Sequence, residues 1–207
     1  ALAGLAQTTG AVDGRFKDQV SKLLDDPNIE VRSAATSLLL GSIDAATRSD
    51  AAATLEAMLA QADPHARARG LRLLGQTGDL SAIGRLMPFL SDPADEARLE
   101  AVLAIEAFMQ TDLTDDLRPT LQRPIQALLA DPIERVRQAA LTILGRLSTR
   151  EAYAALLGVL DDPSAAIRVQ AADAMVAAGK AAIGLVRPKL NSPEARVRTM
   201  AAVILSR

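Results

Sequence analysis

One pattern recurs six times along the 207 residues, and it limits the possible folds more than any other feature of the chain. Each copy has an Asp-Pro or Ser-Pro pair, then an arginine, then small and aliphatic residues at helical spacing, as in LLADPIERVRQAALTILG at 128–145. The six prolines are Pro27, Pro64, Pro93, Pro132, Pro163 and Pro193. Self-similarity at a spacing of roughly 30 to 40 residues predicts stacked structural repeats.

Each copy predicts a pair of helices. An Asp followed by Pro is typical of an N-cap and a first-turn proline, so we expect the second helix of each pair to begin there. Counted from the arginine, a small residue follows at plus three and apolar residues at plus six and plus seven, which places one apolar stripe on the second helix. The small residues are Ala35, Gly70, Ala101, Ala140, Ala171 and Ala201. The sequence therefore predicts an all-α protein.

The position of the arginine fixes the register of each copy. The six reference arginines are Arg32, Arg67, Arg98, Arg137, Arg168 and Arg198. In the second copy, Arg69 competes with Arg67 for this position. We choose Arg67 because Gly70, Leu73 and Leu74 then fall on the apolar stripe, which makes the preceding turn two residues shorter than elsewhere.

The pattern resembles the HEAT repeat family, and its spacing near 30 is most similar to the short HEAT-like repeats of phycobilisome lyases. The resemblance covers residues 12–207 and implies a right-handed α-solenoid of about six stacked antiparallel helix pairs, an armadillo-like superhelix. It also implies a ladder at the turns, in which Asp and Arg side chains of successive repeats pair. The ladder residues would be Asp26, Arg32, Asp63, Arg67, Asp92, Arg98, Asp131, Arg137, Asp162, Arg168 and Arg198, with Ser192 in place of Asp in the last copy. Asp131 and Arg137 are thus interpreted as a structural pair.

We expect residues 1–207 to form a single repeat array. Its repeats span approximately 12–41, 50–75, 79–109, 114–147, 149–178 and 180–207, and residues 1–10 are similar to the tail of a preceding second helix. The segments 41–50 and 109–124 are expected to be surface connections, the second with an additional short helix. Neither end carries a recognisable polar cap, which such arrays need, so we expect flanking domains in a longer polypeptide or a self-contact that covers the ends.

The composition argues against several classes of function. Lys and Arg total 23 against 25 for Asp and Glu, so the net charge of −2 gives no general attraction to nucleic acid or anionic lipid. The chain has no cysteine, which excludes disulfides, thiolate metal ligands and cysteine nucleophiles. It has no apolar run long enough to cross a membrane. We therefore expect a cytoplasmic protein without membrane insertion.

Few side chains are suited to catalysis. His65 is the only histidine, so a His-based triad or a zinc site lacks a second member, and we interpret it as an exposed residue at a helix start. The acidic pairs at 25–26, 115–116 and 161–162 are adjacent in sequence. Adjacent residues on a helix point in different directions, which favours capping over a metal or acid/base site. The sequence thus predicts no catalytic residue, no cofactor and no metal site.

The face of the second helices opposite the apolar stripe is the remaining candidate site, and in the HEAT family this face lines the concave side. Positions plus one, plus two and plus five from the reference arginine supply basic, apolar and polar side chains. The predicted partner-binding residues are Arg69, Arg72, Leu99, Glu100, Leu103, Gln138, Thr142, Val169, Gln170 and Asp173. Leu99 and Leu103 would be apolar side chains on a face open to solvent, which indicates either a contact surface or a site covered by the connection at 109–124.

These observations favour a non-enzymatic module for protein–protein interaction, a scaffold that presents a groove to a protein or peptide and is a monomer in isolation. A bilin lyase or lyase subunit is the alternative implied by the repeat resemblance, although the chain has few aromatic residues. A regulatory domain of a larger enzyme or membrane protein is a third. A HEAT-like DNA glycosylase is the last, because Arg67, Arg69 and Arg72 cluster but have no interleaved aromatic residues for base stacking.

Overall fold

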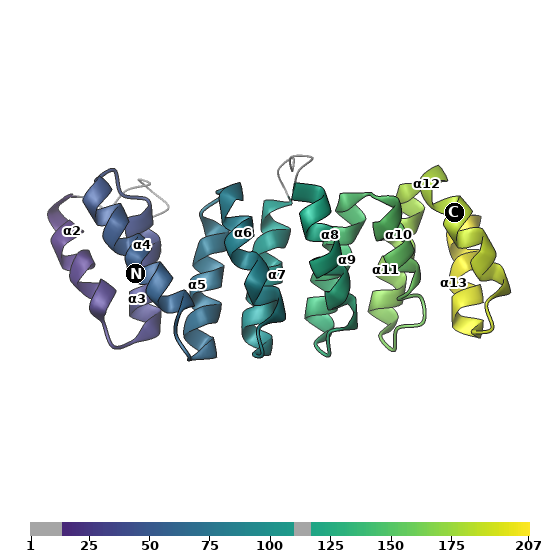
Figure 1. The fold of residues 1–207 in the computed structure, drawn as a ribbon, viewed down its shortest axis with the longest axis horizontal. Coiled ribbons are helices and arrows are strands. Elements are labelled where there is room, and N and C mark those ends of the chain that lie inside the picture. Colours follow the sequence, from purple (N-terminus) through teal and green to yellow (C-terminus); the bar gives the residue numbers. More distant parts are fainter. Residues whose placement is uncertain (1–13, 110–116) are drawn as a thin grey trace. The chain divides into compact units, whose positions relative to one another are not determined.

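The computed structural model describes residues 14–109 and 117–207, and within these ranges the chain forms helices and no β-strand. The all-α class predicted from the apolar periodicity is confirmed. The helices follow one another in pairs along the chain (Figure 1). The chain divides into two compact units, Ala1–Ala104 and Ile105–Arg207.

In the first unit, first and second helices alternate. The first helices are α2 (Gly14–Ser21) followed by the 3-10 helix η1 (Lys22–Asp25), α4 (Ala45–Leu59), and α6 (Ile83–Leu86) between η2 (Leu80–Ala82) and η3 (Met87–Ser91). The second helices are α3 (Ile29–Leu40), α5 (Pro64–Gln76) and α7 (Asp95–Phe108), within which the unit boundary falls. Helices α3, α4 and α5 pack against one another.

The second unit repeats this alternation. Its first helices are α8 (Leu117–Ala127) with η4 (Leu128–Ala130), α10 (Arg150–Leu157), and α12 (Lys180–Val186) with η5 (Arg187–Asn191). Its second helices are α9 (Glu134–Leu147), α11 (Ala165–Ala178) and α13 (Ala195–Ser206). Because α10 contacts α8 and α12, and α11 contacts α9 and α13, the unit has a layer of first helices and a layer of second helices.

Small side chains permit the close approach of these layers. The residue at plus three from each reference arginine is buried in all six repeats, and at five of them it is an alanine with no exposed surface. The sixth is Gly70, where an added Cβ would lie 2.9 Å from Cδ2 of Leu59. Interiors packed this tightly do not admit an extra methylene without strain. The small-residue position is therefore a packing requirement, as the sequence indicates.

The Asp-Pro pair does not begin the second helix in most repeats, contrary to our prediction. The carboxylate instead accepts a hydrogen bond from the backbone N–H two residues later in four turns, those of Asp26, Asp92, Asp131 and Asp162. This Asx turn places the proline in the connection and moves the N-cap to the position occupied by Asn28 or Ser164. Among the turns of the described chain, only that of the second repeat has the predicted arrangement, with Asp63 as N-cap and Pro64 in the first helical turn.

The segment 41–50, predicted to be a surface connection, is mostly helix. Helix α4 begins at Ala45 because Asp44 is its N-cap and accepts the backbone N–H of Thr47 at 3.2 Å. The hydrogen bond from Lys17 Nζ, at 2.6 Å, and those from Thr47 hold the pKa of Asp44 well below its usual range. For the second connection, α8 begins at Leu117, and the additional short helix would fall in 110–116, outside the described residues.

Candidate functional site

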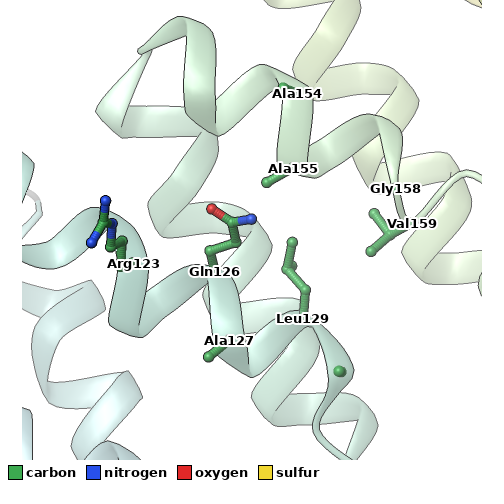
Figure 2. A pocket seen from close by; sticks show the side chains of 9 residues that line it. Arg123, Gln126, Ala127, Leu129, Ala154, Ala155, Gly158 and Val159 are labelled. Atoms are coloured by element: carbon green, nitrogen blue, oxygen red, sulfur yellow. The ribbon is translucent and has the colours of Figure 1, made fainter.

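A shallow depression of about 720 Å³ lies on the first-helix layer of the second unit, between α8 with η4 and α10. Gln126 and Leu129 from one side, and Ala155 and Val159 from the other, border it (Figure 2). Its remaining lining is small or aliphatic except for Arg123. A single cation without an acid, base or nucleophile beside it supplies no reaction chemistry. Sequence reasoning missed this feature, whose only signal is the density of Ala and Gly in the two first helices.

The predicted partner-binding residues lie on the second helices, and we call the surface that they form in each unit its second-helix face. In the first unit it comprises positions plus one, plus two and plus five from the reference arginines of α5 and α7, and in the second unit those of α9, α11 and α13. On α5 and α7 the charged members form ion pairs with neighbouring repeats: Arg72 Nε lies 3.0 Å from Glu100 Oε2, and Arg69 binds Glu30 of α3. The hydrogen bond to Glu100 raises the pKa of Arg72. The predicted basic cluster is therefore neutralised within the first unit.

The polar members in the second unit also bind one another. Gln170 Nε2 on α11 donates to Thr142 Oγ1 on α9 at 2.9 Å and to the Gln138 carbonyl at 3.4 Å. Asp173 forms an ion pair with Arg207 beyond the end of α13, at 2.8 Å. These contacts link adjacent second helices, so the structure brings together Gln138, Thr142 and Gln170 and places Asp173 about one turn further along α11.

Apolar exposure on the second-helix face differs from our prediction. Leu99 and Leu103 are partly buried rather than exposed, and the central part of the connection proposed to cover them lies outside the described residues. Val169 on α11 is 53% exposed, and Val203 on α13, at the plus-five position, is 38% exposed. The exposed apolar side chains of this face are thus on the last two second helices.

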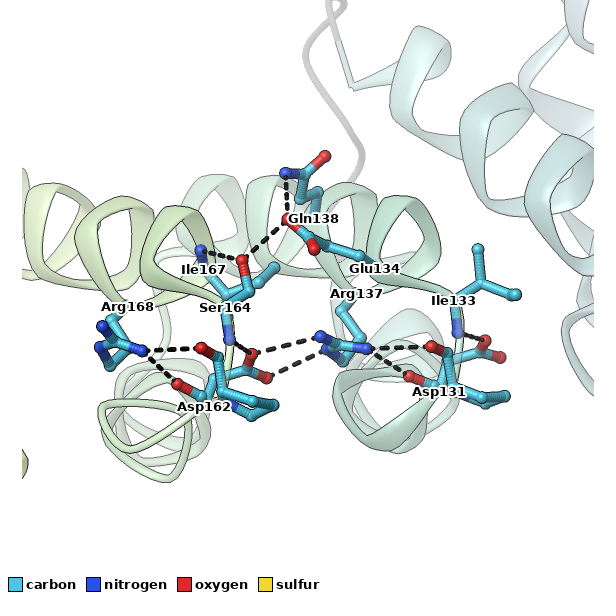
Figure 3. A network of polar contacts seen from close by, with 11 residues as sticks. Asp131, Ile133, Glu134, Arg137, Gln138, Asp162, Ser164, Ile167 and Arg168 are labelled. Atoms are coloured by element: carbon cyan, nitrogen blue, oxygen red, sulfur yellow. Dashed lines mark hydrogen bonds and ion pairs between the residues drawn. The ribbon is translucent and has the colours of Figure 1, made fainter.

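At two of the described turns, the ladder arginine of one repeat forms a bidentate salt bridge with the ladder aspartate of the next repeat. Arg67 binds Asp92 with NH2–Oδ1 and Nε–Oδ2 distances of 2.7 and 2.8 Å. Arg137 binds Asp162 at 3.2 and 3.0 Å through the same atoms (Figure 3). Burial alone raises the pKa of Asp92, but the hydrogen bonds from Arg67 and the Ala94 N–H outweigh it and lower the pKa.

Each ladder arginine also binds its own turn. Arg137 NH1 donates to the carbonyls of Asp131 and Pro132 at 2.9 and 3.3 Å, so its contact with Asp131 is through the backbone, and its carboxylate partner is Asp162 (Figure 3). The interpretation of Asp131 and Arg137 as a side-chain pair is therefore wrong in its detail. The same two carbonyl bonds are made by Arg32, Arg98, Arg168 and Arg198.

The second repeat shows why Asp63 is not a rung. Arg67 NH1 binds the carbonyls of Gln61 and Ala62, at 3.0 and 2.8 Å, so the position of the ladder Asp is occupied by Gln61. Asp63 lies two residues further and caps α5. This geometry supports the choice of Arg67 over Arg69 as the reference arginine. Arg32 consequently has no ladder carboxylate in the repeat that follows it.

The remaining candidate side chains do not assemble into a site. His65 is exposed at the start of α5, with Nε2 at 3.4 Å from Glu30 Oε1 and Nδ1 at 3.7 Å from Glu96 Oε2. Across residues 14–109 and 117–207, no group of three His, Asp or Glu side chains is arranged to hold a metal ion. The helices in these ranges are also too short or too polar to cross a membrane.

Residues 16–106 and 121–206 match the family model of HEAT repeats. The chain therefore belongs to the HEAT repeat family, as the repeated Asp-Pro and arginine pattern indicates. No curated protein matches it by sequence.

Solved structures of repeat proteins share the fold. The YibA protein of Escherichia coli has 20% identity and a TM-score of 0.61 over 99% of this chain and 74% of that one. A designed armadillo repeat protein in complex with a (KR)4 peptide has 18% identity and a TM-score of 0.57, over 91% and 97%. The complex of CpcE and CpcF of phycocyanin lyase from Nostoc has 20% identity and a TM-score of 0.53, over 91% and 75%. At these identities the likeness concerns the fold alone.

Proposed function

We propose that the chain is a non-enzymatic module that binds a protein or peptide on its second-helix face. The observation that carries the proposal is the pair of exposed valines on α11 and α13, Val169 and Val203, which lie among polar side chains of the same face. Exposed apolar side chains surrounded by polar groups are typical of contact surfaces, in which an apolar centre is enclosed by a polar rim.

We call this region the α11–α13 patch and define it by Val169, Gln170, Asp173, Thr199, Met200 and Val203. Gln170 and Asp173 are already held by Thr142 and Arg207, so their orientations are fixed before a partner arrives. Binding to side chains on packed helices requires little additional ordering, which reduces the entropic cost of association. Leu99 and Leu103 are less suitable anchors than the valines because they are already partly buried.

The alternative functions receive less support from the described residues. The lyase alternative depends on the fold shared with CpcE and CpcF, and the depression on α8 and α10 has only Arg123 as a charged lining residue. The glycosylase alternative required a free basic cluster, whereas Arg67, Arg69 and Arg72 are all paired with carboxylates. The designed armadillo protein with its bound peptide shows that a related fold accommodates a peptide.

The test combines capture of a partner with a measurement of stability. The double variant Val169→Asp/Val203→Asp places two charges on the patch and should abolish capture of the natural partner. Its free energy of unfolding, obtained from thermal melts, should stay within about 0.5 kcal/mol of the wild type because both sites are at the surface. Ile43→Asp is the matched control: Ile43 is 89% exposed and lies in the α3–α4 connection of the first unit, outside the set of residues that defines the patch. Unchanged capture by the double variant would remove the proposal.

A further inference from the structure

The ladder carboxylate is shared between two arginines. The Asp162 carboxylate binds Nε and NH2 of Arg137 at 3.0 and 3.2 Å. In the first unit, burial raises the pKa of Asp92, but hydrogen bonds and the positive charges of Arg67 and Arg98 lower it. Arg67 belongs to the preceding repeat, whereas Arg98 belongs to the same turn as Asp92. One carboxylate therefore balances the arginine of the preceding repeat and the arginine of its own turn.

The turn between η5 and α13 keeps this backbone geometry but has Ser192 in place of the aspartate. The φ and ψ angles of Ser192 are −59° and 143°, and those of Asp92 and Asp131 are −59° and 137°, and −63° and 139°. Ser192 Oγ accepts the Glu194 N–H at 3.3 Å, as the Asp131 carboxylate accepts the Ile133 N–H at 2.9 Å. The turn therefore has the shape of a ladder turn and lacks only the carboxylate.

Arg168 of the preceding repeat is oriented as a ladder arginine. Its NH1 group binds the Asp162 and Pro163 carbonyls at 2.6 and 3.0 Å. Figure 3 shows the Arg168 and Arg137 guanidinium groups in the same orientation, with the two remaining nitrogens of Arg168 directed away from its own turn. Helix α13, which follows the Ser192 turn, packs against α11, so both repeats of this rung lie within the described chain. No carboxylate of the residues that the structure describes binds Arg168.

The charges around the Ser192 turn are predominantly basic. Residues 187–198 include four basic side chains and one acidic side chain, whereas the equivalent segment of the preceding repeat, 157–168, includes one basic and two acidic side chains. Arg198 NH1 binds the Ser192 carbonyl at 2.8 Å, so a second guanidinium group lies at this turn. Arg168 and Ser192 are partly exposed and Arg198 is exposed, so dissolved ions can reach them. The rung therefore has two guanidinium groups and no ladder carboxylate.

From this incomplete rung, we infer that the Ser192 turn is an oxyanion-binding site, in which a carboxylate or phosphate group takes the place of the ladder aspartate. Nε and NH2 of Arg168 bind two oxygens of the anion, as those of Arg137 bind a ladder carboxylate, because the planar guanidinium group matches both carboxylate and phosphate. The Ser192 hydroxyl donates its proton to the same anion, and the charge of Arg198 adds to the attraction. None of these residues belongs to the α11–α13 patch, so the site does not depend on the proposed function.

The test follows the arginine Nε–H signals by heteronuclear NMR during titration with inorganic phosphate and, separately, with acetate, at constant ionic strength. The Arg168 signal, identified by its loss in Arg168→Gln, should shift and saturate, and the ion that saturates it at the lower concentration identifies the preferred oxyanion. Ser192→Asp supplies the carboxylate from the chain, so the signal should no longer respond and the urea midpoint should rise by about 0.3 M. A wild-type signal that saturates with neither ion, or a Ser192→Asp signal that responds like the wild type, would overturn the proposal.

Arg196→Gln is the matched control for Arg168→Gln, because each removes one positive charge from the same region. Arg196 is exposed and binds none of the turn carbonyls in the described chain. Phosphate stabilises proteins in general, so the readout is the additional rise of the urea midpoint that binding to the folded state produces. Phosphate should raise the midpoint more in the wild type and Arg196→Gln than in Arg168→Gln and Ser192→Asp. Equal rises in all four proteins would contradict the site. Partner capture through the valines of the α11–α13 patch should persist in Ser192→Asp, which separates this proposal from the proposed function.

Discussion

Replacing Arg137 with alanine removes one of the two ladder ion pairs observed between successive repeats. The side chain makes two hydrogen bonds to the Asp162 carboxylate and two to the carbonyls of Asp131 and Pro132. The Arg137 and Asp162 side chains are only 12% and 7% exposed. The substitution therefore leaves a buried carboxylate whose remaining described contact is the Ser164 N–H at 2.8 Å.

The magnitude follows from this burial. Removing one partner of a buried ion pair costs about 3 to 5 kcal/mol, and the small remaining exposure of both side chains lets water offset part of the loss. We expect Arg137→Ala to lower the free energy of unfolding by about 3 kcal/mol, which corresponds to a urea midpoint about 1 M lower for a chain of this size. This expectation concerns the second unit, where both residues lie.

Arg168→Ala is the matched control, because it lies in the same unit and makes the same two carbonyl bonds, at 2.6 and 3.0 Å. The position of the next ladder carboxylate is occupied by Ser192, so this substitution breaks no ion pair. It should cost about 1 kcal/mol, the usual net worth of hydrogen bonds whose acceptors water can reach. Urea unfolding followed by the helical circular dichroism signal compares the two. If both variants lose the same free energy of unfolding, the Arg137–Asp162 ion pair does not account for the larger cost expected for Arg137→Ala.

Three further predictions concern packing, acid stability and nucleic acid. Gly75→Ala should destabilise the protein by about 1 to 3 kcal/mol because the new Cβ would lie 2.6 Å from the Cβ of Ala104. Gly145→Ala meets only a 3.5 Å contact with the Cβ of Ala174 and should stabilise the protein by about 0.5 to 1 kcal/mol. Thermal melts in which Gly75→Ala is the more stable variant would contradict this. Asp92→Asn should lower the free energy of unfolding at neutral pH. Because the pKa of Asp92 is lowered in the folded state, the difference in unfolding free energy from wild type should shrink as the pH falls below about 4. A difference in urea melts that does not change with pH would refute it. Fluorescence anisotropy with DNA oligonucleotides at physiological salt should show no tight binding, because the net charge is −2 and the basic cluster is paired; sub-micromolar affinity with a steep salt dependence would favour the nucleic-acid function.

Helix periodicity and register could be predicted from the sequence because they depend on spacing within one repeat. The choice of Arg67 is an example: the apolar stripe requires Gly70, Leu73 and Leu74 on one side, and the structure then places Arg67 on the turn carbonyls as in the other repeats. The start of the second helix could not be predicted so well. An Asp before Pro can cap a helix or close an Asx turn. Asp63 lies four residues before its reference arginine, at the N-cap position, whereas Asp131 lies six before its own and closes the turn.

Contacts between repeats were less predictable because they depend on the repeat that follows. Arg137 binds Asp162, 25 residues further along the chain, rather than the side chain of the nearer Asp131. Leu99 and Val169 occupy the same position after the reference arginine of their own repeats. Burial depends on the neighbouring helices, however, and Leu99 is partly covered whereas Val169 is 53% exposed.

The most direct test of partner binding on the second-helix face is site-specific photocrosslinking from position 169, with a crosslinking residue in place of Val169 and the same residue at Ile43 as the control. Both sites are exposed, so solvent access alone does not distinguish them. Excess unlabelled wild-type chain should suppress the adduct formed from position 169, and the Val169→Asp/Val203→Asp chain should not. An adduct that forms equally from both sites, or that both competitors suppress equally, would contradict binding at the α11–α13 patch.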